Sequence, residues 1–232
     1  RWDVKNSALK KIVEFNISDE DKFYYYQHLA DANYQLRQYD ETIKYSKIAL
    51  DIETRDDKNN SALYLEKLLF SSFLSVGAPR AEDALKIMDL YNNPEEDLQL
   101  STIKADILIN NGQKEKGLER IVSKFMDLDN PTSENYFSVF NLLNDLCNSE
   151  IISVSSLQEV EDQNLVKIKG MDDWFFINSN KKQAGSIPVS TDDVRYKSFK
   201  GAKVGSIINL GGRERTIEII YNFASYLFYK SS

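Results

Sequence analysis

The residues of this chain that could take part in chemistry are few and lack the spacing that a known reaction needs. His28 is the only histidine among the 232 residues. This excludes a metal site with several histidines and a serine triad whose base is another histidine. The segment Gly201–Gly205, with Lys203 at its centre, lacks the Gly-Lys-Ser/Thr ending of a phosphate-binding P-loop. We therefore expect no catalytic residue, no metal ion and no cofactor, and we expect this segment not to be an enzyme.

Carboxylates, which serve in acid–base catalysis and metal binding, occur here in adjacent pairs. Four such pairs lie in predicted links or turns: Asp56-Asp57, Glu95-Glu96, Asp172-Asp173 and Asp192-Asp193. Links and turns run over the protein surface, where water solvates charged side chains. We interpret these pairs as solvated charge.

The net charge of −7 divides unevenly along the chain. From Leu165 onward there are 11 Lys/Arg and 6 Asp/Glu, a local charge of +5, so the first 164 residues carry −12. An acidic segment joined to a mildly basic one predicts two domains with different partners. Four cations of the basic segment are candidates for contact with phosphate or an acidic partner: Lys200, Lys203, Arg213 and Arg215. A solvated hairpin tip is the alternative for the two arginines.

The composition is that of a globular protein, with 42% hydrophobic and 28% charged residues. The chain has no apolar run of about 18 residues, so we expect no membrane-spanning helix and no membrane partner. Cys147 is the only cysteine; without an internal disulfide, a reducing, cytoplasmic location is expected. The chain begins at Arg1 without a methionine or a signal peptide, and we expect it to be a fragment of a longer protein.

The elements that must position these residues differ between the two parts of the chain. Up to about Ser149, apolar residues recur at the spacing of amphipathic helices. Three helical pairs are predicted, with turns at Arg37-Gln38, Gly77-Ala78-Pro79 and Asn110-Asn111-Gly112: Tyr26–Thr54, Ser61–Pro94 and Glu95–Pro131. A further helix, Glu134–Asn148, is expected to cover the exposed end of the last pair.

The first pair resembles a tetratricopeptide repeat (TPR), a helix-turn-helix unit of about 34 residues. The large and small residues that carry the resemblance are Tyr26, Leu29 and Ala30 before the turn, and Tyr39, Ile43 and Ala49 after it. In the third pair, ADILINNGQKEKGLERI resembles the centre of such a repeat. Its two small-residue positions are Ala105 and Gly117, and its turn glycine is Gly112.

The equivalent mid-repeat residues are Thr42, Ala84 and Gly117, which are 42 and 33 residues apart. The longer first interval predicts an insertion at residues 55–60. An unrelated α-helical bundle is the alternative. The resemblance implies a scaffold whose groove holds a protein or peptide partner, with four expected groove residues: Tyr26, Asn33, Arg37 and Lys104.

From about Leu165 the pattern changes to alternating, glycine-punctuated strands. Residues 165–169 and 174–178 predict one β-hairpin, and residues 206–210 and 214–220, joined at Gly211-Gly212, predict a second. Between them, Gly201 is expected to end a short helix with a positive φ, and Gly205 to permit the turn into the strand. Val204 is expected to be buried between them. Residues 221–229 fit a helix or a strand.

The segment YKSFKGAKVGSII resembles the C-terminal domain of bacterial transcript-cleavage factors of the Gre type. Phe199, Gly201, Lys203, Val204 and Gly205 fit that family's spacing, and the resemblance covers about 60 residues. It implies an FKBP-like antiparallel sheet that docks on RNA polymerase or another large partner. The acidic coiled-coil tip with which these factors stimulate RNA cleavage is missing, so that activity is not expected here.

A TPR array followed by a Gre-like domain further resembles large bacterial proteins that carry a PIN-type nuclease. No carboxylate cluster on a βαβ scaffold is visible, so a nuclease would lie outside this segment. The second functional hypothesis is therefore a recruiting or regulatory segment of a nuclease acting on RNA or DNA, in defence against foreign nucleic acid.

We therefore predict an α+β chain in two parts. A TPR-like helical solenoid, residues 1–149, is followed by a polar linker, residues 150–163, and a small antiparallel β-rich domain, residues 164–232. The main functional hypothesis is a non-enzymatic scaffold for protein–protein interaction.

Overall fold

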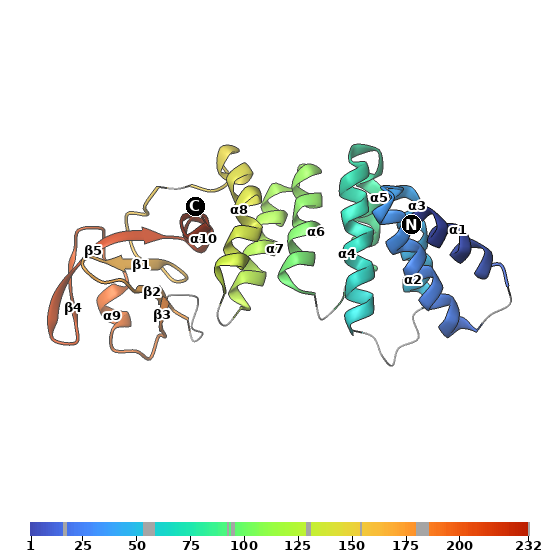
Figure 1. Cartoon of the computed structure of the whole chain (residues 1–232). Coiled ribbons are helices and arrows are strands. Elements are labelled where there is room, and N and C mark those ends of the chain that lie inside the picture. The colour runs from blue at the N-terminus through green and yellow to red at the C-terminus, as the bar shows by residue number, and fades with distance from the viewer. Residues whose placement is uncertain are drawn as a thin grey trace. The chain divides into compact units, whose positions relative to one another are not determined.

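The computed structural model describes residues 1–15, 18–52, 59–91, 93, 96–128, 131–153, 155–179 and 186–231. The fold is α+β, with helices first and a sheet towards the C-terminus, as predicted (Figure 1). Two compact units form, Arg1–Gly117 and Leu118–Ser232. They divide inside a helix and not near residue 149. Most of the expected insertion at residues 55–60 lies outside the described residues.

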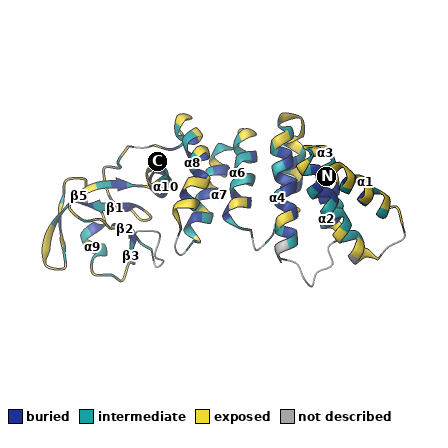
Figure 2. Ribbon diagram, in the orientation of Figure 1, coloured by how far each residue is buried: buried dark blue, intermediate teal, exposed yellow. Residues whose placement is uncertain are grey.

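The first unit is helical and contains the predicted pairs. Its elements are α1 (Trp2–Ile12), α2 (Asp19–Gln35), α3 (Tyr39–Ile52), α4 (Asn59–Val76), the 3-10 helix η1 (Ala78–Arg80), α5 (Ala81–Met88), α6 (Leu98–Asn110) and the first turn of α7 (Lys114–Met126). Ser18 begins α2 because its hydroxyl accepts a hydrogen bond from the Asp21 amide at 3.1 Å. The helices have one buried and one exposed side (Figure 2).

Small residues allow the helices of a pair to approach closely, as the sequence predicted. Ala30 and Ala49 are fully buried in the core of α1, α2, α3 and α4. At Gly117 a Cβ atom would lie 2.6 Å from the Ile109 Cγ1 atom and 3.0 Å from the Ala105 carbonyl oxygen. Any larger residue there would push α7 away from α6.

Two helices of this unit end in the same left-handed turn, with different residues in it. After α6, Gly112 has φ 76° and its amide donates to Ile109 O at 2.9 Å. After α2, Arg37 has φ 58° and its amide donates to Tyr34 O at 2.9 Å. Both are Schellman motifs, which favour glycine at the left-handed position. Arg37 therefore carries a conformational strain that Gly112 does not.

The second unit contains the remainder of α7, α8 (Ser133–Asn148), a five-stranded sheet and two more helices. The strands are β1 (Leu165–Ile168), β2 (Trp174–Ile177), β3 (Ser186–Val189), β4 (Ile207–Leu210) and β5 (Arg213–Tyr221), and the helices are α9 (Tyr196–Phe199) and α10 (Phe223–Ser231). The sheet order is β3-β2-β1-β5-β4. Both predicted hairpins are confirmed, because β1–β2 and β4–β5 pair antiparallel.

The sheet is mixed and not antiparallel throughout, so that part of the prediction is wrong. β3, for which no strand was predicted, runs parallel to β2, with Ile187 opposite Phe175. One face of the sheet forms a core with Phe199 of α9. The other is covered by α10, whose Phe223 ring lies 5.5 Å from that of Phe176.

The expected linker is packed against the sheet. Leu157 N donates to Ile220 O at 2.7 Å, and Val160 N donates to Ala202 O at 2.8 Å. Val160 is 1% exposed. The described residues of segment 150–163 are therefore part of the second unit. Apolar residues among the polar ones, Ile152, Leu157 and Val160, hold the segment there.

The glycine turn before β4 has the predicted backbone. Gly201 and Gly205 have φ values of 74° and 85°. Val204 between them is 38% exposed, so the expectation that it is buried is wrong. Phe199 and Ile208 occupy the core on either side of the turn.

The helix α8 makes contacts on two sides within the second unit. The rings of Phe125 in α7 and Tyr136 in α8 lie 5.3 Å apart. Phe140 of α8 stacks on Phe228 of α10 at 6.4 Å. The helix thus contacts the last predicted repeat helix, as expected, and α10 as well. No described helix is long and apolar enough to cross a membrane.

The two Schellman turns give a matched pair of substitutions. Arg37→Gly should raise the free energy of unfolding of the helical unit by about 0.5–1 kcal/mol. Relief of about 1–2 kcal/mol of left-handed strain exceeds the entropy that glycine adds to the unfolded chain. Gly112→Ala should lower it by about 1 kcal/mol, since a Cβ there has open space and only φ is unfavourable. Urea denaturation followed by circular dichroism measures both, and the same sign for both would contradict the assignment.

Candidate partner-binding surface

The first helices of the repeated pairs, α2, α4 and α6, present a polar face beside the core. Tyr24, His28 and Asp31 lie on α2 at the i, i+4, i+7 spacing that places side chains on one helix face. Tyr64 and Lys67 lie on the corresponding face of α4. We call these five residues the A-helix surface.

Hydrogen bonds and ion pairs connect this surface across helices. Tyr64 Oη donates to Asp31 Oδ1 at 2.8 Å, which joins α4 to α2. Lys5 Nζ of α1 lies 3.6 Å from Asp31 Oδ2. Lys67 forms an ion pair with Asp97, the N-cap of α6. Burial and the hydrogen bond to Asp31 raise the pKa of Tyr64 to about 12, so its hydroxyl remains a donor at neutral pH.

Aromatic rings are the most exposed large side chains of this surface. Tyr24 is 55% exposed and Tyr64 is 41% exposed. The His28 ring meets the Tyr24 ring edge to face, with centroids 4.3 Å apart. Burial and the Lys5 ammonium lower the pKa of His28, against the opposite effect of Asp31, so the imidazole is neutral at pH 7. The arrangement can stack and hydrogen-bond a partner.

Three of the four expected groove residues lie elsewhere. Tyr26 is half-buried and stacks on Tyr45 of α3, with centroids 6.0 Å apart. Asn33 is fully buried and exchanges two hydrogen bonds with Asn6 of α1, at 3.1 and 3.2 Å. Both were assigned to the wrong side of α2. The spacing of Tyr24, His28 and Asp31 was the signal that could have identified the exposed side.

Arg37 is exposed in the turn after α2, so it is accessible but does not lie on the helix face. Lys104 is fully buried, and its assignment to a groove is wrong. Its ammonium group lies in a polar cluster with Glu66 Oε2 at 3.2 Å, Glu96 Oε2 at 2.9 Å and Tyr91 O at 2.8 Å. An ammonium group has three N–H donors, and here each has an acceptor.

This buried cluster holds one cation and two carboxylates. The Lys104 ammonium also lies 5.0 Å from the centre of the Phe70 ring. Burial raises the pKa of Glu66, and Lys104 counteracts that rise. Removing a single member of such a cluster leaves uncompensated charge in a poorly solvated place. Its role is to join α4, α6 and the segment that precedes α6.

The four cations proposed in the basic segment differ in their surroundings. Lys200 Nζ lies 2.9 Å from Asp162 Oδ1, which also accepts a hydrogen bond from Tyr196 Oη at 2.7 Å. These contacts of Tyr196 and Lys200 hold the pKa of Asp162 below its usual range. Lys200 is thus already paired.

The other three cations make no ion pair within the described parts of the chain. Lys203 and Arg213 are exposed and Arg215 is half-exposed. In the register of β4 and β5, Arg213 lies opposite Leu210 and Arg215 opposite Ile208. Arg213 and Arg215 therefore share one face of the hairpin, as alternate residues of a strand do.

The search for a metal or catalytic site gives little. Within the described ranges, no group of three or more His, Cys, Asp or Glu side chains is placed to hold a metal ion. Comparison of the chain with family models, with curated proteins and with solved structures returns no match. The TPR and Gre resemblances therefore stay hypotheses.

The Lys104 cluster gives a direct stability test. Lys104→Met keeps most of the side-chain volume but leaves two carboxylates without their cation, so the free energy of unfolding should fall by about 3–5 kcal/mol. Lys44→Met, on an exposed lysine of α3, is the control and should change it by about 0.5 kcal/mol or less. Urea denaturation of both variants measures the difference. Equal stability of the two would show that the cluster contributes nothing.

Proposed function

We propose that the helical unit is a non-enzymatic module that binds a protein partner along the A-helix surface. The observation that carries the proposal is the exposure of two tyrosine rings, Tyr24 and Tyr64, on adjacent helices. Tyrosine is enriched in protein interfaces because it combines a large apolar ring with a hydrogen-bonding hydroxyl. The polar residues around the rings supply further donors and acceptors.

The surface is also preorganised. The hydrogen bond to Asp31 restricts the Tyr64 side chain before a partner arrives. A side chain that is already ordered loses less entropy on binding, a cost of about 0.5–1.5 kcal/mol for a flexible one. The two rings are thus suited to act as the energetic centre of an interface.

The sheet unit supports a second, separate proposal, that it docks an acidic partner through the β4–β5 hairpin. Arg213 and Arg215 lie on one face and lack ion-pair partners in the described structure. RNA polymerase as that partner is suggested by the Gre resemblance alone. A nucleic acid, the alternative drawn from the nuclease hypothesis, would use the same two arginines through its phosphates.

Site-specific photo-crosslinking tests the A-helix surface. A photoreactive phenylalanine analogue at position 24 or 64 should crosslink one partner of the same mass, in the cells that produce the protein. The matched control is position 137, where Phe137 is 76% exposed on α8. The same crosslinked bands from all three positions, or none from positions 24 and 64, would refute the proposal.

The nucleic-acid alternative is tested by fluorescence anisotropy with labelled single-stranded RNA. If it holds, binding weakens with salt, and Arg213→Ala/Arg215→Ala reduces affinity about tenfold and lowers the salt slope. Lys200→Ala, which removes a cation already paired with Asp162, should bind like the wild type. Absence of binding at low salt would exclude nucleic acid.

A further inference from the structure

A crevice of about 210 Å³ lies between α3 and α5, the second helices of the first two pairs. Its floor is apolar and consists of Ile43, Phe73 and Ile87; its rim is charged and consists of Lys47, Arg80, Asp83 and Lys86. We call it the α3–α5 crevice. None of its residues belongs to the A-helix surface.

The spacing of residues in both helices explains how the crevice forms. On α3, Ile43 and Lys47 are four residues apart and therefore lie on the same helix face. On α5, Asp83 and Ile87 have the same separation, and Lys86 lies one residue before Ile87. Each helix thus contributes one isoleucine to the floor and one lysine to the rim.

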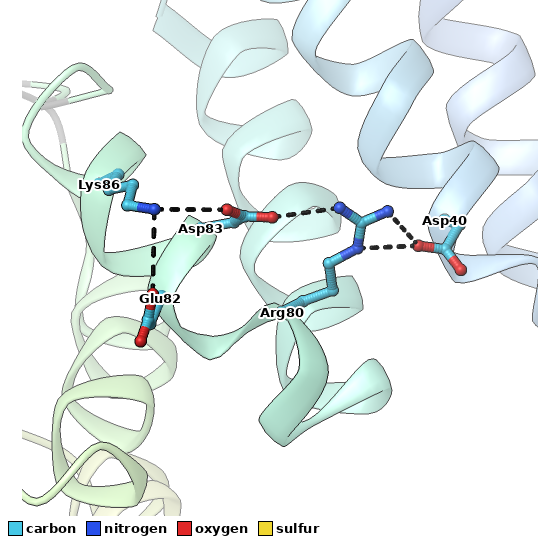
Figure 3. A network of polar contacts seen from close by, with 5 residues as sticks. All are labelled: Asp40, Arg80, Glu82, Asp83 and Lys86. Carbon is cyan, nitrogen blue, oxygen red and sulfur yellow. Dashed lines mark hydrogen bonds and ion pairs between the residues drawn. The ribbon is translucent and has the colours of Figure 1, made fainter.

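Arg80 connects the two helices (Figure 3). Its Nε and Nη2 donate to Asp40 Oδ1 of α3 at 3.2 and 3.0 Å, and its Nη1 donates to Asp83 Oδ2 of α5 at 3.1 Å. The guanidinium charge is therefore balanced by carboxylates of the protein itself. This network joins the helices without using the two lysines of the rim as hydrogen-bond donors.

The two lysines are differently placed. Lys86 Nζ lies 3.9 Å from Asp83 Oδ1 and 4.0 Å from Glu82 Oε2, too far for hydrogen bonds (Figure 3). Lys47 is half-buried and makes no hydrogen bond or ion pair with a described residue. Two ammonium groups thus flank an apolar floor with donors available for a bound group. They are a local exception in a half of the chain that carries −12.

We propose that the α3–α5 crevice binds an acidic peptide segment of a partner protein. One apolar side chain of the segment lies on Ile43, Phe73 and Ile87, and its neighbouring carboxylates contact Lys47 and Lys86. The volume supports this occupant, since small-molecule pockets begin at about 300 Å³ and 210 Å³ suits a single side chain. The charge supports it because the two available rim groups are both cationic.

Methyl NMR of the full chain tests the proposal, because the two isoleucines report from the floor. The probes are three synthetic peptides: acetyl-Glu-Leu-Glu-amide, acetyl-Lys-Leu-Lys-amide and acetyl-Glu-Ser-Glu-amide. We expect saturable shifts of the Ile43 and Ile87 methyl signals with the first peptide alone, and a dissociation constant of about 1 mM or tighter. The Ile208 methyl of the sheet unit should not move.

Charge reversal supplies the second measurement. Lys47→Glu/Lys86→Glu should weaken binding of the Glu-Leu-Glu peptide at least about tenfold. Lys44→Glu, the same change at an exposed position of α3 outside the crevice, should leave binding unchanged. The proposal is overturned if no peptide shifts the two methyl signals, if the lysine peptide shifts them equally, or if the double variant binds like the wild type. These outcomes are independent of crosslinking at the A-helix surface.

Discussion

The helical unit depends on a charge that it buries. Lys104 of α6 has no exposed surface, and its three donors reach Glu66 of α4, Glu96 and the Tyr91 carbonyl. Burying a lysine is favourable only when every N–H has a partner, so the positions of α4, of α6 and of the chain between α5 and α6 are all restricted by this group. Apolar contacts around Leu69, Phe70 and Leu100 surround it.

With these helices held from inside, their outer sides are free to differ. The face of α2 and α4 presents tyrosines whose hydroxyl and ring positions are set by Asp31 and His28. The side formed by α3 and α5 instead presents an apolar floor between lysines, with Arg80 as a cross-link. One unit therefore carries two surfaces of different chemistry. Since neither shares a residue with the other, both can be occupied together.

Much of the fold was predictable, because it depends on local patterns. The helical pairs, the Ser18 cap, both hairpins and the turn at Gly201 follow from periodicity and from backbone preferences of single residues. The surfaces were less predictable. Asn33 and Lys104 are polar residues that a sequence pattern assigns to solvent, yet each is buried because a distant residue, Asn6 or Glu66, satisfies it. The parallel β3 strand likewise depends on a partner that no local pattern reveals.

The sequence by itself determined which segments are helical or extended and where most turns occur, since those choices are decided within a few residues. It also determined that no second histidine is available and that charge is divided between the two ends. Only the tertiary structure decided which side of each helix faces solvent, which charges neutralise one another and that segment 155–163 belongs to the sheet unit. The physical reason is that burial of a polar group depends on a hydrogen-bonding partner far away in the chain, and such partners are brought together only by folding.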